Sequence, residues 1–283
     1  MKPGNSGATI LFFSVLLTVS LIAATCTGIF VTGFYAKETM NWQVQSVGQD
    51  WVNLFIVVPS LILSAFFSYR KSKIAGLLWA GVVTYIFYTF IIYCFAVHFN
   101  RLFPLYCLIL GLSFYSLLWF SYSQARHPAI YVMSNNIVSR ITGIYFLILS
   151  LIFYFLWLSE IIPAMIKGTV PASLHSTGLL TNPVHVLDLS ILLPGIFIIG
   201  LLVLRRNRAG FPFSVIMLTF FILMDITIGW LAFLMYRREL LSNFSVTAMM
   251  TGLAVITLVL LAWNLKSNRK NEAPIDLNPG IIS

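Results

Sequence analysis

Residues 211–236 read FPFSVIMLTFFILMDITIGWLAFLMY, an apolar run in which Asp225 is the single Asp, Glu, Lys, Arg or His. A helix of about 20 apolar residues is long enough to cross the hydrocarbon core of a bilayer. The run is continuous, so it lacks the alternation of apolar and polar residues that marks a membrane β-strand. It therefore predicts a transmembrane helix.

The rest of the chain repeats this pattern. The 283 residues are 59% hydrophobic and 9% charged, with a mean hydropathy of +0.94, which excludes the soluble globular class. The whole therefore predicts an all-α bundle of eight transmembrane helices in contact with the lipid bilayer. Besides 211–236, the predicted spans cover residues 9–33, 51–69, 74–97, 103–122, 141–163, 187–204 and 245–265.

The positive charges predict the orientation. Cytoplasmic loops retain Lys and Arg, and twelve of the 17 such residues fall in one set of loops, with five in the other. Both termini are therefore expected in the cytoplasm. The formal charge of +9 is then mostly a topology signal, and no basic domain indicates a nucleic-acid partner. The larger set is Lys2, Arg70, Lys71, Lys73, Arg126, Arg140, Arg205, Arg206, Arg208, Lys266, Arg269 and Lys270.

A pattern of four residues occurs twice and predicts two related halves. Asp, Pro, Arg and Gly follow one another in the same order, although the distance from Asp to Pro differs between the copies. Four spans in each half would relate the halves by an axis along the membrane normal. The predicted parts are the halves 1–122 and 141–265, a cytoplasmic linker at 123–140 and a cytoplasmic tail at 266–283. The paired residues are Asp50, Pro59, Arg70 and Gly76, and Asp188, Pro194, Arg205 and Gly210.

Several polar residues are expected near the outer face. If the sixth helix begins near Pro183, His185 and Asp188 share one of its faces. Together with Asp50 and His98 they offer nitrogen and oxygen ligands for a divalent metal, or a proton relay. The simpler interpretation is that Asp50 and Asp188 cap the starts of two helices. Glu160 lies near the end of the fifth span and is a further binding candidate.

Asp225 differs from these residues because it lies in the middle of its span. A carboxylate there costs several kcal/mol unless it is neutral, paired or in a wet cavity, so it is a functional candidate by default. The alternative is a protonated or hydrogen-bonded packing role against a Tyr or Thr of a neighbouring helix; if the repeat holds, the candidates are Thr84, Tyr85 and Tyr88 in the third span.

The segments Gln49-Asp50, His98-Phe-Asn100 and Asn182-Pro-Val-His-Val-Leu-Asp188 resemble a group of uncharacterised bacterial integral membrane proteins of similar length. The resemblance runs across most of the chain. It implies a multi-pass protein of the bacterial inner membrane and carries no activity with it.

The sequence contains no phosphate loop, dinucleotide fingerprint or metalloprotease motif, and it indicates no cofactor. These observations favour a non-enzymatic role: binding or transport of a small solute or protons through an outward-facing polar vestibule. Two alternatives stay open at this point, namely a membrane-embedded metal-dependent enzyme and a sensor or accessory subunit of a protein partner.

Overall fold

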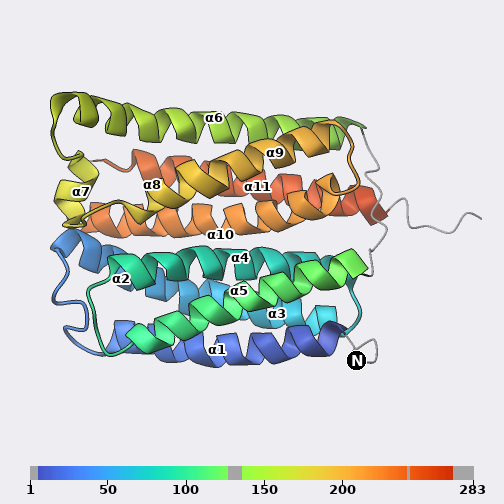
Figure 1. The fold of residues 1–283 in the computed structure, drawn as a ribbon, viewed down its shortest axis with the longest axis horizontal. Helices are drawn as coiled ribbons and strands as arrows, with labels where there is room; N and C mark the ends of the chain where they lie inside the picture. The colour runs from blue at the N-terminus through green and yellow to red at the C-terminus, as the bar shows by residue number, and fades with distance from the viewer. Residues whose placement is uncertain (1–5, 127–135, 241–242, 270–283) are drawn as a thin grey trace, which may run out of the picture.

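The computed structural model describes residues 6–126, 136–240 and 243–269, and within these ranges the protein is all-α (Figure 1). Eight segments are helical, long and apolar enough to cross a membrane, which confirms the predicted spans. The first four spans are α1 (Ser6–Phe30), α2 with η1 and α3 (Met40–Val52, Asn53–Val57, Val58–Tyr69), α4 (Lys73–Ala96) and α5 (Phe103–Arg126). The fifth span is α6 (Asn136–Lys167). The rest are α8 with η2 and α9 (Pro183–Leu187, Asp188–Leu192, Leu193–Leu204), α10 (Gly210–Arg237) and α11 (Ser245–Arg269), with a short helix α7 (Ala172–Thr177) before α8.

Two of the spans contain one turn of π-helix. In the second span the Val58 N–H donates to the Asn53 carbonyl, and in the sixth span the Leu193 N–H donates to the Asp188 carbonyl. Each turn is followed by a proline, Pro59 or Pro194. Because proline lacks an N–H and clashes with the preceding turn, a wider turn just before it keeps the span helical.

The same two spans also end alike. Lys71 and Arg206 follow the last residues of α3 and α9 with positive φ angles of 68° and 55°. When the two spans are aligned on their π turns, Asp188 corresponds to Asn53 and Asp50 corresponds to His185, so the two Asp residues of the sequence pattern are offset by about one turn in this alignment. The division of the chain into two related halves itself stays a prediction.

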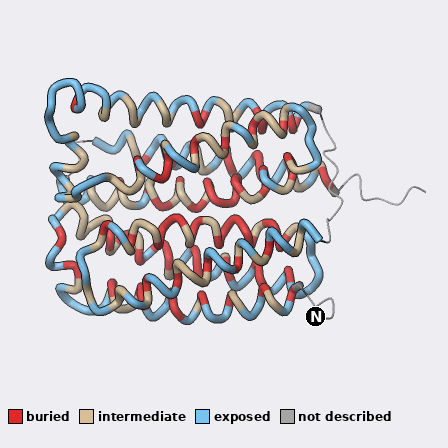
Figure 2. Tube along the Cα trace, viewed as in Figure 1, coloured by how far each residue is buried: buried red, intermediate tan, exposed pale blue. Residues whose placement is uncertain are grey.

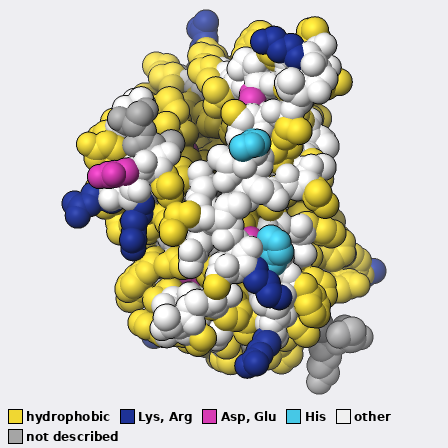
Figure 3. Space-filling model, turned by 90° about the vertical axis from the view of Figure 1, so that its left-hand side faces the viewer, with side chains coloured by type: hydrophobic (Ala, Val, Ile, Leu, Met, Phe, Trp, Pro, Cys, Tyr) yellow, Lys and Arg dark blue, Asp and Glu magenta, His cyan; other side chains and the backbone are white. Residues whose placement is uncertain are grey.

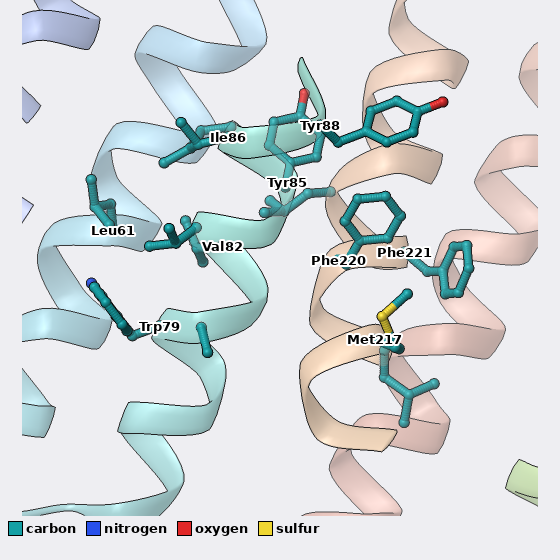
Figure 4. Packing of buried hydrophobic residues seen from close by; sticks show 14 of the residues in the cluster. Leu61, Trp79, Val82, Tyr85, Ile86, Tyr88, Met217, Phe220 and Phe221 are labelled. Carbon is teal, nitrogen blue, oxygen red and sulfur yellow. The ribbon is translucent and has the colours of Figure 1, made fainter. Parts of the chain in front are cut away.

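Helices α4 and α10 form the centre of the bundle, where the buried residues concentrate (Figure 2). Gly81 of α4 lies so close to α10 that an added Cβ would be 2.6 Å from the Ile216 carbonyl oxygen. Figure 4 shows the rings of Tyr85, Tyr88 and Phe220 between the two helices. The ring centroids of Tyr88 and Phe220 are 5.6 Å apart in an edge-to-face contact.

Two helix starts differ from the predicted ones. The second span begins at Met40 rather than near residue 51, because the Thr39 hydroxyl caps it by accepting from the Trp42 N–H. The sixth span begins at Pro183, where the Asn182 side chain accepts from the Val184 N–H. Asp50 and Asp188 therefore lie inside their spans, and the capping interpretation of these two residues is wrong.

Helices extend into both ends of the predicted linker and into the start of the predicted tail. Residues 123–126 belong to α5, 136–140 belong to α6, and 266–269 belong to α11, while 127–135 and 270–283 lie outside the described residues. An even number of spans places the start of α1 and the end of α11 at the same end of the bundle, here named the terminal end. The opposite end carries α7 and is named the α7 end (Figure 1). Which end faces the cytoplasm stays a prediction.

Candidate functional site

A cavity of about 450 Å³ lies in the part of the bundle toward the α7 end. Its walls come from α2, α4, α6, α8 with η2 and α9, and α10, and α7 borders its mouth. Figure 3 looks onto this end and shows a hollow bordered by hydrophobic side chains. The cavity thus brings together segments from both the first and the second part of the chain.

Most of the lining is apolar or aromatic, including Phe153, Trp157 and Phe220. No Lys or Arg occurs among the described residues that line it, whereas three acids do: Glu160, Asp188 and Asp225. An apolar pocket with a few convergent polar groups is typical of a site for a small molecule. Acidic side chains outnumber basic ones in the described lining, where His185 is the one basic group.

The start of α2 supplies a polar stripe that the sequence analysis missed. Asn41, Gln45 and Gln49 line the cavity and recur every four residues, which places them on one face of the helix. The Gln49 amide donates to the Tyr85 hydroxyl at 2.6 Å and to the Asn53 side-chain oxygen at 3.1 Å. The four-residue spacing is the signal that reveals the stripe.

Asp188 is held by two aromatic donors. The Tyr88 hydroxyl donates to Oδ1 and the Trp157 indole N–H donates to Oδ2, both at 2.8 Å. Asp188 is 6% exposed. Since each oxygen already accepts a hydrogen bond from a fixed ring, this carboxyl joins α4, η2 and α6 around the cavity.

Glu160 and His185 face each other beside Trp157. Glu160 Oε1 accepts from the Ser173 N–H at 2.9 Å, and its Oε2 lies 3.9 Å from His185 Nε2, which is too long for a hydrogen bond. His185 Nε2 is buried and has no hydrogen-bond partner. The His185 ring lies against Trp157, with centroids 4.6 Å apart. The two side chains are therefore within ion-pair distance, without a direct hydrogen bond between Glu160 Oε2 and His185 Nε2.

Asp225 lines the deeper part of the cavity. The Thr257 hydroxyl of α11 approaches Asp225 Oδ2 at 3.2 Å, and that hydroxyl also lies 2.6 Å from the Tyr145 hydroxyl and 2.8 Å from the Leu253 carbonyl. The expected partners in the third span are engaged elsewhere. Tyr88 binds Asp188, so the partner of Asp225 is a threonine of a neighbouring helix, as the packing interpretation expects, but it lies on α11 and not in the third span.

Asp50 and His98 lie outside this cavity. Asp50 is 1% exposed and accepts from the hydroxyls of Tyr35 and Tyr93, each at 2.7 Å. The carboxylate of Glu38 accepts from the His98 backbone N–H and contacts Nδ1, both at 2.8 Å. Glu38 was missed by the sequence analysis because nothing in the local pattern links it to a residue so distant in the chain.

The metal ligand set proposed from the sequence is therefore not brought together. Asp50 is buried between Tyr35 and Tyr93 and the exposed His98 contacts Glu38, while His185 and Asp188 lie at the cavity. Within the described ranges, no group of three or more His, Cys, Asp or Glu side chains is arranged to hold a metal ion. The geometry gives no support to the metal-dependent enzyme.

Comparisons with protein-family models, curated proteins and solved structures find no match. What stands is the architecture, a multi-pass all-α membrane protein with eight candidate spans. The resemblance to bacterial inner-membrane proteins is supported only to that extent.

Proposed function

We propose that this protein binds a small, largely apolar solute in the cavity and moves it across the membrane together with protons exchanged at Asp225. The cavity volume of about 450 Å³ falls within the range of small-molecule sites, about 300–1,000 Å³. In this proposal the protein lies in a bacterial inner membrane with both termini in the cytoplasm, so the cavity faces outward.

The observation that carries this proposal is the surroundings of Asp225. Thr257 has one hydroxyl proton, and its neighbours include two acceptors, the Leu253 carbonyl and Asp225 Oδ2, besides the Tyr145 hydroxyl, which can donate or accept. When Asp225 is ionised, Thr257 can donate to it. When Asp225 is protonated, it can donate to Thr257, whose own proton then goes to Leu253. Both protonation states thus have a hydrogen bond, as a group that repeatedly gains and loses a proton requires.

Other titratable groups surround the same cavity. Glu160, His185 and Asp188 line it from α6, α8 and η2, and Tyr145 reaches Thr257 from α6. Both oxygens of Asp188 accept hydrogen bonds from ring donors, whereas the Thr257 hydroxyl approaches only Oδ2 of Asp225. Intramembrane carboxyls in such positions are typical of proton relays in transporters.

Transport requires a second arrangement, because the bundle below the cavity is closed by the contact of α4 with α10. In our proposal the two predicted halves rock against each other around the cavity, as in transporters built from parallel repeats. The π turns before Pro59 and Pro194 are points at which two cavity-forming spans can bend.

Binding can be tested in nanodiscs with a panel of phenylethyl, naphthylethyl and indolylethyl compounds, each as the amine, the alcohol and the carboxylate. Equilibrium dialysis should show saturable binding of at least one compound. Leu231→Trp, which fills the cavity, should abolish it, whereas Leu258→Trp on an exposed face of α11 should not. Binding that is absent in wild type, or that survives Leu231→Trp, contradicts the proposal.

Proton exchange is tested with the bound compound in proteoliposomes. Asp225→Asn should retain binding and lose uptake driven by a pH gradient. Asp50→Asn is the matched control because it removes a carboxyl that lies outside the cavity. Uptake that remains equally pH-dependent in Asp225→Asn would exclude the proton role, provided that circular dichroism shows both variants folded.

A further inference from the structure

The acids at the cavity differ in how much of their hydrogen-bonding capacity remains. Asp188 accepts from a ring donor at each oxygen. Glu160 accepts at Oε1 only, and its Oε2 faces the buried His185 Nε2, which has no hydrogen-bond partner. Glu160 and His185 are therefore the residues to which a ligand could add hydrogen bonds.

The chemistry of the missing group follows from these two atoms. An ionised carboxylate oxygen can only accept, so the group must donate to Glu160 Oε2. A neutral imidazole with its proton on Nδ1 also accepts at Nε2. A group with several N–H donors satisfies both atoms after a small rotation of the Glu160 side chain. An ammonium has three such donors, whereas a hydroxyl has one and a carboxylate none.

The charged residues that line the cavity also favour a cation as the ligand. The described residues that line it include three acids and no Lys or Arg. A cation there is attracted by the carboxylates and meets no like charge, while an anion is repelled. Aromatic walls add to this preference, since the faces of Trp157 and Phe153 attract cations.

We propose that the solute is an organic cation, a primary or secondary amine with an apolar body, whose ammonium group binds between Glu160 and His185 with the body lying toward Phe220 and Met224. This inference rests on the proposed function and names the class of solute. It also separates two roles, because the amine binds at Glu160 while Asp225, deeper in the cavity, exchanges the proton.

The test uses the same matched panel at pH 7 in nanodiscs that contain the full chain. Wild type should bind each amine about tenfold or more tightly than the alcohol on the same scaffold, since a charge-assisted hydrogen bond is roughly twice as strong as a neutral one. The carboxylates should bind more weakly than the alcohols. Glu160→Gln should remove most of the preference for amines and leave the affinity for alcohols nearly unchanged.

Glu239→Gln is the control substitution, because Glu239 is exposed at the α7 end and does not line the cavity. It should leave the preference intact. His185→Phe provides a second variant that keeps an aromatic ring against Trp157 and removes the acceptor, and it should also weaken amine binding selectively.

The outcomes separate this inference from the proposed function. If no compound binds, both fail. If alcohols or carboxylates bind as tightly as amines, the cavity binds solutes but the inference about cations is overturned. If the preference for amines is lost in Asp225→Asn and kept in Glu160→Gln, the ammonium lies at Asp225 and the assignment to Glu160 and His185 is overturned.

Discussion

Replacing Tyr88 with Phe removes one hydroxyl group and leaves the ring in place. The hydroxyl donates to Asp188 Oδ1 at 2.8 Å, and the Tyr88 side chain and Asp188 are 5% and 6% exposed. The ring keeps its edge-to-face contact with Phe220 in the variant. The substitution therefore isolates one hydrogen bond of the clamp around Asp188.

Its magnitude follows from the chemistry of the acceptor. A hydrogen bond to a charged group contributes about 1.5–3 kcal/mol. We expect Tyr88→Phe to lower the free energy of unfolding by about 2 kcal/mol, a change of roughly thirtyfold in the ratio of folded to unfolded protein. Combining it with Trp157→Phe, which removes the donor to Oδ2, should cost more than the two single changes added together.

The assay is unfolding by SDS in mixed micelles, followed by far-ultraviolet circular dichroism. Tyr115→Phe is the control, because Tyr115 is 64% exposed on α5. It should change the free energy of unfolding by less than about 0.5 kcal/mol. If Tyr88→Phe is as mild as this control, or if the double variant is merely additive, the clamp does not hold a charged carboxylate and our reasoning about Asp188 fails.

Two further predictions concern packing and pH. Gly81→Ala should cost about 1–3 kcal/mol in the same titration, because its Cβ would clash with the Ile216 carbonyl and separate α4 from α10; an unchanged midpoint would contradict this. Burial and the Asp50 carboxyl raise the pKa of Tyr35, so the unfolded chain ionises first and stability is lost above about pH 10. Melting temperatures at pH 9 to 11 should show a shallower decline for Tyr35→Phe, and an equally steep decline would refute the assignment.

The spans could be predicted because side chains that face lipid must be apolar, and this requirement acts on every turn of a helix. A prediction based on apolar runs does not find the start of the second span. Asn41, Gln45 and Gln49 lie on a helix face directed at the cavity, so their turns do not satisfy a criterion based on continuous apolar runs. The sequence analysis consequently placed the start of this helix near residue 51 and took Asp50 for a cap.

The pairings of the polar residues could not be predicted. Position along a span gives the depth of Asp225 in the membrane, but not which neighbouring helix its carboxyl faces. That depends on how α10 packs against α11, whose Thr257 is the partner found. The contact of His98 with Glu38 is likewise set by the meeting of two connecting segments from different parts of the chain.

The burial of an acid alone does not indicate whether it can bind a ligand. Asp50 and Asp188 are almost completely buried, yet each has both oxygens occupied by ring donors, so they have little capacity for a ligand. Glu160 and Asp225 retain an oxygen that no such donor occupies, one near the mouth and one deep in the cavity. In our proposal the carboxyls with a free oxygen bind the ligand and exchange the proton, and because they are two different residues, binding and proton exchange are separable. Glu160→Gln should therefore change the affinity for amines and Asp225→Asn the dependence on the pH gradient, whereas a single shared site would alter both in either variant.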